Sequence, residues 1–295
     1  MLNLSANARW TPLGVTVLHG LNGPLGLAVD QDNDTVYVAD QCNHRIVATA
    51  LGNTEGQIAA GGNGKGNALN QLKYPSDVLI DRETHSLIIS DAGNRRIMRW
   101  SLASGTKEGE IIINNIGCNR LAMDSDGALY VTLPYDHKVR RYKKLDKTGV
   151  VVAGGNRMGN RVDQLNKPYY VAVDDEGAVY VSDNSNHRIV RWLKRARTGE
   201  VVAGGRGDGH DIKQLSYPNG VFVDSSRTIY VAEGGNDRVT RWRNGATSGE
   251  IILGGNGRGD RADQFRVPVG LSFDSHGNLY IVDNGNHRVQ RFSIL

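Results

Sequence analysis

Apolar residues fall into short runs of three to five along this chain, and Gly, Asn and Asp residues separate the runs. One run, rich in Val, Ile and Tyr, recurs six times and ends at an acidic residue in five of the copies. The copies occupy residues 36–40, 87–91, 129–133, 179–183, 229–233 and 279–283, at steps of 51, 42, 50, 50 and 50 residues. A period this regular predicts one supersecondary unit that is repeated six times.

The fourth repeat gives the clearest pattern of a single unit. It contains four apolar or alternating runs, at residues 170–174, 179–182, 188–192 and 200–203. The connections between these runs are too short for a crossover helix, so the runs are expected to pair as antiparallel strands. Six such units predict an all-β fold, a six-bladed β-propeller with four-stranded antiparallel blades.

The two ends of the chain are predicted to close the ring together. The last repeat, residues 269–295, provides three strands, and residues 14–18 form an extra strand before the first complete repeat. We expect residues 14–18 to be the outer strand of the last blade, because this pairing leaves no large open sheet edge. Residues 1–295 would then form a single domain.

The connection after the recurring strand carries a specific phrase. Residues 40–46, 183–189 and 283–289 follow the pattern Asp-x-x-Asn-His-Arg-Ile/Val, and residues 94–97, 136–139 and 236–239 are weaker copies. With a Pro-x-Gly entry and a Tyr-Val-x-Asp strand, this phrase resembles the NHL-repeat propellers over nearly the whole chain. The resemblance implies a six-bladed ring. In some animal members of the family, a basic face binds single-stranded RNA.

Residues that recur in equivalent positions are interpreted as scaffold. The histidines of the phrase (His44, His137, His187 and His287) lie in different blades, too far apart to share a metal ion. The Asp and Arg of each copy are expected to form an ion pair that rigidifies the connection. The Gly-rich segments, such as residues 61–66, lead to a Pro and another strand, whereas a phosphate-binding loop would lead into a helix.

Function is sought where the repeats differ. The two residues after the Pro position begin each inner strand, beside the central channel, and they vary strongly between blades. We predict that the unlike polar residues at this channel mouth bind a small ligand or peptide: Asp77, Asn119, Arg120, Tyr169, Tyr170 and Asn219. Ordinary sequence drift at a solvated channel mouth is the alternative. The missing loop implied by the 42-residue step marks the first place to look for a ligand.

Two other functions are kept as alternatives. The Gly-rich loops carry exposed cations that could bind an anion or RNA, although acidic residues are interleaved among them: Lys65, Arg157, Arg206 and Arg258, with Arg161 and Arg261 beside them. Some six-bladed relatives are metal-dependent hydrolases or lyases. Here the channel positions contain no His, and no nucleophile motif is present. We therefore expect no catalytic residues, no cofactor and no metal.

Composition narrows the class of protein rather than its ligand. The net charge of +4 and the pI of about 9.0 permit an anionic partner without requiring one. Cys42 and Cys118 are expected to be free thiols. The sequence has no membrane-spanning run and no signal peptide pattern. The sequence therefore indicates a soluble, cytoplasmic monomer that serves as an interaction scaffold for a protein segment or small polar ligand.

Overall fold

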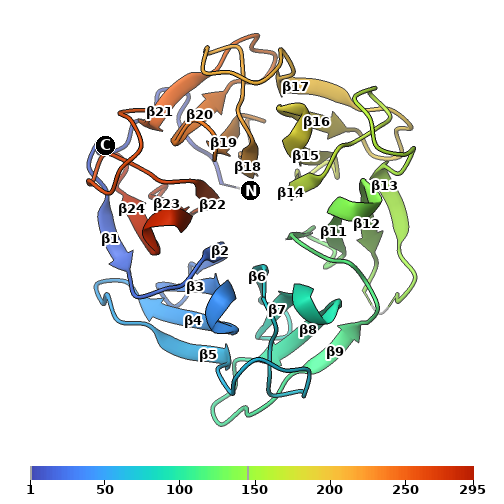
Figure 1. Cartoon of the computed structure of the whole chain (residues 1–295), viewed down its shortest axis with the longest axis vertical. Coiled ribbons are helices and arrows are strands. Elements are labelled where there is room, and N and C mark those ends of the chain that lie inside the picture. Colours follow the sequence, from blue (N-terminus) through green and yellow to red (C-terminus); the bar gives the residue numbers. More distant parts are fainter. Residues whose placement is uncertain (1, 145) are drawn as a thin grey trace.

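The computed structural model describes residues 2–144 and 146–295, which form six four-stranded antiparallel sheets around a central channel (Figure 1). Blade 1 contains β2 (Pro24–Asp30), β3 (Thr35–Asp40), β4 (Arg45–Ala50) and β5 (Gln57–Gly61). Blade 2 contains β6 (Asp77–Asp81), β7 (Ser86–Asp91), β8 (Arg96–Ser101) and β9 (Glu110–Ile113). Blade 3 contains β10 (Leu121–Met123), β11 (Leu129–Leu133), β12 (Lys138–Tyr142) and β13 (Val150–Gly154).

The remaining blades follow the same order from the channel outward. Blade 4 contains β14 (Pro168–Val173), β15 (Val179–Asp183), β16 (Arg188–Trp192) and β17 (Glu200–Gly204). Blade 5 contains β18 (Pro218–Val223), β19 (Ile229–Glu233), β20 (Arg238–Trp242) and β21 (Glu250–Gly254). Blade 6 contains β22 (Pro268–Phe273), β23 (Leu279–Asp283) and β24 (Arg288–Phe292), together with β1 (Val15–Leu18) from the start of the chain.

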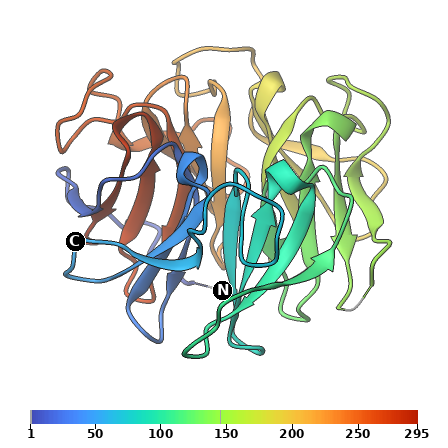
Figure 2. The same ribbon diagram turned by 60° about the horizontal axis from the view of Figure 1, so that its bottom comes forward.

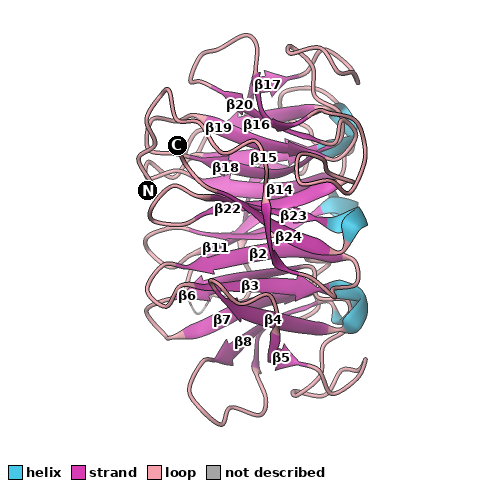
Figure 3. Cartoon of the chain, turned by 90° about the vertical axis from the view of Figure 1, so that its left-hand side faces the viewer, coloured by secondary structure: helices cyan, strands magenta, loops and turns pink. Residues whose placement is uncertain are grey.

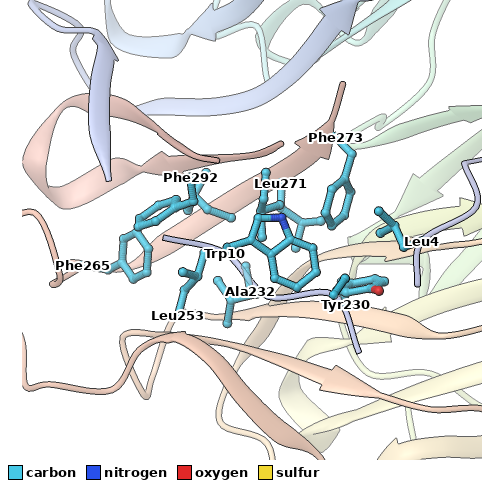
Figure 4. Packing of buried hydrophobic residues seen from close by; sticks show 13 residues of the cluster. Leu4, Trp10, Tyr230, Ala232, Leu253, Phe265, Leu271, Phe273 and Phe292 are labelled. Carbon is cyan, nitrogen blue, oxygen red and sulfur yellow. The ribbon is translucent and has the colours of Figure 1, made fainter. Parts of the chain in front are cut away.

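The predicted closure of the ring is confirmed. Strand β1 pairs antiparallel with β24, with Val15 opposite Arg291 and Leu18 opposite Val289. Residues 2–12 add a second tie, because Trp10 lies in the apolar layer between blades 5 and 6 (Figure 4). Its indole Nε1 donates to the carbonyl oxygen of Gly277 at 2.8 Å, and its ring meets Tyr230 edge-on at 6.0 Å between centroids. Residues from both ends of the chain therefore hold blade 6.

Short 3₁₀ helices lie together on one face of the ring, which we call the upper face (Figure 3). They connect the second and third strands of five blades: η1 (Gln41–Asn43), η2 (Ala92–Asn94), η3 (Pro134–Asp136), η4 (Asn184–Asn186) and η5 (Asn284–Asn286). The Gly-rich loops leave the outer strands toward the same face. The side view shows the blades standing side by side around the channel (Figure 2). No helix in the described part of the chain is long and apolar enough to cross a membrane.

The repeated Asp-x-x-Asn-His-Arg phrase is scaffold, as blade 4 illustrates. The carboxylate of Asp183 is fully buried and accepts hydrogen bonds from Asn186 Nδ2 and Arg188 Nε, both at 2.7 Å. The other end of the Arg188 guanidinium donates to carbonyl oxygens of the Gly-rich loop before the blade, at residues 160, 161 and 164. His187 Nδ1 accepts from the backbone N–H of Tyr217 in blade 5 at 3.2 Å. We call this contact between successive blades the latch.

The boundary between blades 2 and 3, which we call the irregular seam, lacks this arrangement. Strand β9 ends at Ile113 and β10 begins at Leu121, so the connection has no Gly-rich loop. The Asp and Arg positions of blade 3 are occupied by Leu133 and Lys138. The latch position of blade 2 is occupied by Arg95. A backbone bond replaces the latch, because the N–H of Ile116 donates to the carbonyl oxygen of Arg95 at 2.8 Å.

Candidate functional site

Six equivalent positions meet at the middle of the channel, where three neighbouring blades provide large side chains and the other three provide glycine. Blades 2, 3 and 4 provide Asp77, Arg120 and Tyr170, all of which are buried, and Arg120 is not exposed at all. Blades 1, 5 and 6 provide Gly26, Gly220 and Gly270. A Cβ on Gly26 would overlap the Asp77 carboxylate, and one on Gly270 would lie 2.8 Å from the Tyr170 hydroxyl. The three large side chains, which we call the plug, therefore fill the channel.

Arg120 forms the centre of the plug. Its Nη1 donates to the carbonyl oxygen of Ser76, its Nη2 lies 3.1 Å from the hydroxyl of Tyr169, and its guanidinium carbon lies 4.7 Å from the ring centroids of Tyr169 and Tyr170. Burial opposes the charge of Arg120, but both phenols and the nearby Asp77 raise its pKa above the ordinary value. The guanidinium is therefore a permanent positive charge inside the channel.

Asp77 is the acidic member of the plug. Its Oδ2 accepts from the backbone N–H of Leu121 at 2.8 Å, which joins blade 2 to blade 3. Burial raises the pKa of Asp77 to about 6, although Arg120 and the hydrogen bond from Leu121 oppose the rise. The carboxyl group is thus mostly ionised at neutral pH and gains a proton in mildly acidic solution.

Above the plug lies a cavity of about 540 Å³, which we call the upper chamber. Residues of blades 1 to 4 line it, and the lining includes two cations, Arg95 and Lys167, but no carboxylate. Neither cation forms an ion pair with a described residue. Phenol rings, amides and backbone groups supply the rest of its polar surface. A separate cavity of about 300 Å³ lies below the plug, and Asp77 and Tyr170 line that one.

The six residues predicted at the channel mouth take three different positions. Asn119 and Tyr169 line the upper chamber. Asp77, Arg120 and Tyr170 belong to the plug beneath it. Asn219 is buried in the ring, where its Nδ2 donates to the carbonyl oxygen of Pro268 at 3.0 Å. Tyr169 connects the groups, because its ring lines the chamber and its hydroxyl meets Arg120.

The sequence analysis missed several chamber residues, among them Tyr74, Arg95, Tyr135, Lys167 and Asn184. Arg95 could have been found, because it replaces His or Asp at the latch position. Tyr135 could have been noted as an aromatic residue in a polar connection, and it is 88% exposed. Tyr74 and Lys167 each lie directly before the Pro of their repeat, and no feature of the repeat marks them.

The exposed cations of the Gly-rich loops lie around the outer part of the upper face and do not gather at one point. Lys65 lies beside Tyr74 at 3.1 Å from its hydroxyl, while Arg157, Arg206 and Arg258 belong to three other blade connections. Some of these cations form ion pairs with neighbouring carboxylates. Arg161 pairs with Asp163 at 2.8 Å, and Arg258 lies 3.5 Å from Asp237.

Two further features concern chemistry at the site. Cys42 and Cys118 are both free thiols. Cys118 lines the upper chamber, and burial raises the pKa of its thiol to about 11, so it stays protonated at neutral pH. In the part of the chain that the structure describes, no three His, Cys, Asp or Glu side chains are grouped so that they could hold a metal ion.

Fold and site together define a six-bladed propeller with a plugged channel and a chamber on its loop-rich face. The NHL repeat family model matches residues 21–48, 165–192 and 265–292. These three matches and the six-bladed ring support an NHL-repeat propeller. No curated protein matches its sequence.

Solved structures of several proteins share the fold. An auxiliary nutrient binding protein from Bacteroides thetaiotaomicron has a TM-score of 0.73 at 17% identity, over 98% of this chain and 77% of its own. A putative gluconolactonase has a TM-score of 0.68 at 16% identity, over 99% and 93%. A streptogramin B lyase has a TM-score of 0.60 at 11% identity, over 96% and 97%. At these identities the likeness extends to the fold alone.

Proposed function

We propose that this protein is a non-catalytic binding propeller that takes a polar, carboxylate-bearing ligand, either a small molecule or a protein segment, into the upper chamber. The observation that carries the proposal is the chamber itself, which is lined by Arg95 and Lys167 without a carboxylate. Its volume of about 540 Å³ lies within the range of about 300–1,000 Å³ that is typical of small-molecule sites.

The chemistry of the lining favours an anion. Arginine offers a planar fork that matches a carboxylate, and a second cation in the chamber adds attraction without requiring one binding geometry. The permanent charge of Arg120 lies beneath the chamber, in contact with the lining residue Tyr169. The amide groups of Asn119 and Asn184 can provide the directional hydrogen bonds that distinguish one polar ligand from another.

Binding rather than catalysis is favoured by what the lining residues can do at neutral pH. The Cys118 thiol stays protonated, because burial raises its pKa to about 11, so it is a poor nucleophile. One of the proteins that share the fold is named an auxiliary nutrient binding protein, which is consistent with a binding role. Two others carry the names of enzymes.

A matched pair of probes tests this proposal. Succinate and its neutral diamide succinamide have the same carbon skeleton, so their difference reports charge recognition. We expect succinate to bind the wild-type protein in a calorimetric titration at low salt, and succinamide to bind at least tenfold more weakly. The double variant Arg95→Gln/Lys167→Gln should lose at least tenfold in succinate affinity, because it removes both cations of the chamber.

The control is the double variant Arg157→Gln/Arg206→Gln, which removes two positive charges from the outer loops and leaves the chamber unchanged. Its succinate affinity should stay within twofold of the wild type. Equal losses in both double variants would show a nonspecific effect of net charge and would overturn the proposal. A short single-stranded RNA that binds the wild type but not the outer-loop variant would instead favour the RNA-binding alternative.

A further inference from the structure

A tyrosine of the second strand lies at the boundary with the next blade in every blade except the second. Tyr37, Tyr130, Tyr180, Tyr230 and Tyr280 occupy this position, and blade 2 has Ile88. In blades 3 to 6 the hydroxyl donates to an Asp at the end of the inner strand, at 3.1, 3.2, 3.3 and 3.1 Å. The repeat therefore uses a phenol to fill this place, and the irregular seam lacks it.

A cavity of about 220 Å³ lies beside Ile88 in the irregular seam, separate from the upper chamber. The cavity reaches inward to Ile88, Ile113, Met123 and Tyr142. The boundary between blades 4 and 5 has a hollow of about 340 Å³ in the equivalent place, but Tyr180 lines it.

That hollow does not reach the residues equivalent to the inner wall of the seam cavity, which are Ala203, Val223 and Trp242. The substitution of Ile for Tyr thus coincides with a deeper, more aliphatic cavity. The outer part of the seam cavity is lined by charged residues, and its apolar inner wall can accommodate an aromatic ring.

The polar groups that hold the tyrosine hydroxyl elsewhere are still present in blade 2. In blade 3 the hydroxyl of Tyr130 contacts Asp124 and accepts from Arg141 Nε at 2.8 Å. The equivalent residues of blade 2, Asp81 and Arg99, both line the cavity. The buried Nε of Arg99 has no hydrogen-bond partner among the described residues, which is also true of the equivalent Arg191, Arg241 and Arg291 in blades that carry the tyrosine. Asp81 Oδ2 already accepts from the Thr84 hydroxyl at 2.6 Å, and Arg99 Nη1 donates to Glu110 Oε1 at 2.8 Å. Because a carboxylate oxygen can accept more than one hydrogen bond, Asp81 and the Nε of Arg99 can still serve as acceptor and donor for a ligand hydroxyl.

We propose that the cavity between blades 2 and 3 binds a phenol, with the ring beside Ile88 and Met123 and the hydroxyl between Asp81 and Arg99. The ligand replaces the tyrosine that the other blades contain. This site goes beyond the anion-binding chamber, because it takes a different chemical class in a different cavity. Phenol chemistry can come from a free aryl compound or from a tyrosine side chain of a partner.

The experiment uses p-cresol, which has the same ring and hydroxyl as a tyrosine side chain. We expect saturable binding of p-cresol to the wild type by ligand-observed NMR and a rise in melting temperature. Ile88→Tyr should lower the affinity at least tenfold, because its own phenol fills the cavity. Ile88→Leu, which keeps an aliphatic side chain of the same size, should bind within threefold of the wild type.

A reciprocal variant keeps the proposal testable even if Ile88→Tyr fails to fold. Tyr180→Ile should create the same vacancy between blades 4 and 5 and add a second p-cresol site. Toluene, which lacks the hydroxyl, should bind the wild type at least threefold more weakly than p-cresol. The proposal is overturned if p-cresol does not bind the wild type, or if Ile88→Tyr binds it unchanged.

N-acetyltyrosinamide separates the two sources of the phenol. Binding of both compounds, each lost in Ile88→Tyr, assigns the site to a tyrosine side chain of a partner. Binding of p-cresol alone assigns it to a free phenol.

Discussion

Five boundaries between blades share the latch, and the irregular seam between blades 2 and 3 lacks it. At each regular boundary a His or Asp side chain accepts a hydrogen bond from the backbone of the next blade, at 2.8 to 3.3 Å. At the irregular seam Arg95 takes that position and faces the upper chamber. The same seam has Ile88 in place of tyrosine and contains the cavity of about 220 Å³.

Several residue replacements at the irregular seam coincide with one structural change, the short connection between β9 and β10. The short connection before β10 lacks the Gly-rich loop, and blade 3 has Leu133 and Lys138 in place of the Asp–Arg pair. The side chain at position 95 is likewise released from holding the next blade. Residues that are free of the scaffold can then take part in binding.

The largest expected effect comes from removing the buried carboxylate at a regular boundary. Asp91 accepts from the backbone N–H of Lys73 and from Arg96 Nε, both at 2.7 Å, and neither charged side chain is more than 4% exposed. Asp91→Ala leaves the Arg96 guanidinium buried without its partner, so it should cost about 3–5 kcal/mol in the free energy of unfolding, measured by urea denaturation.

The matched change at the irregular seam is Asp136→Ala, which removes the partner of Lys138. This pair is largely exposed, so the loss should stay below about 0.5 kcal/mol. Equal losses in Asp91→Ala and Asp136→Ala would contradict the assignment of the buried pair to the scaffold of regular boundaries.

A smaller effect depends on pH and concerns Asp77, which crosses the irregular seam to Leu121. Burial raises its pKa in the folded protein to about 6, from an ordinary value of 3.8. The folded state therefore holds the proton more tightly than the unfolded state. The stability that Asp77 contributes is fully present below about pH 4 and is lost as the pH rises through about 6.

Comparison with Asp77→Asn isolates this contribution, because the amide does not titrate. Between pH 4 and pH 7 the wild type should lose up to about 3 kcal/mol of unfolding free energy relative to the variant. The measurement is urea denaturation of both proteins across this range. A difference that does not change with pH would show that Asp77 is ionised in the folded protein throughout.

The smallest expected effect compares the two kinds of latch position. His187→Ala removes the acceptor for the Tyr217 N–H and should cost about 1 kcal/mol, since the lost bond is a single neutral one. Arg95→Ala should change stability by less than about 0.5 kcal/mol, because its backbone carbonyl still holds Ile116. Thermal unfolding of both variants checks this, and a greater loss in Arg95→Ala would mean that its side chain supports the ring.

The fold could be predicted from the sequence because each blade repeats the same local pattern. The alternation of apolar residues gave the strands, and the orphan run at residues 14–18 identified the closing strand, which is β1. The burial of Asp77 and Arg120 inside the channel was harder to predict from the sequence. Whether Asp77 and Arg120 face solvent or each other depends on glycines in other blades, such as Gly26 of blade 1. That relation between distant positions is absent from any single repeat.

The two cations of the chamber and the seam cavity were missed for a related reason. Arg95 and Ile88 lie in repeats that otherwise look ordinary, and each is informative only when all six copies are aligned by structural role. The short connection, by contrast, was visible as a 42-residue step, and it borders the upper chamber through Gly117 and Asn119.

The central claim, that the irregular seam is where this propeller binds its ligands, can be tested by hydrogen exchange with mass spectrometry. The wild-type protein is compared with and without saturating succinate and p-cresol. The account predicts added protection in peptides that cover residues 88–99, 111–135 and 165–170, and no change in the Gly-rich loops of blades 4 to 6. Protection confined to residues 204–214 and 254–264 would contradict it.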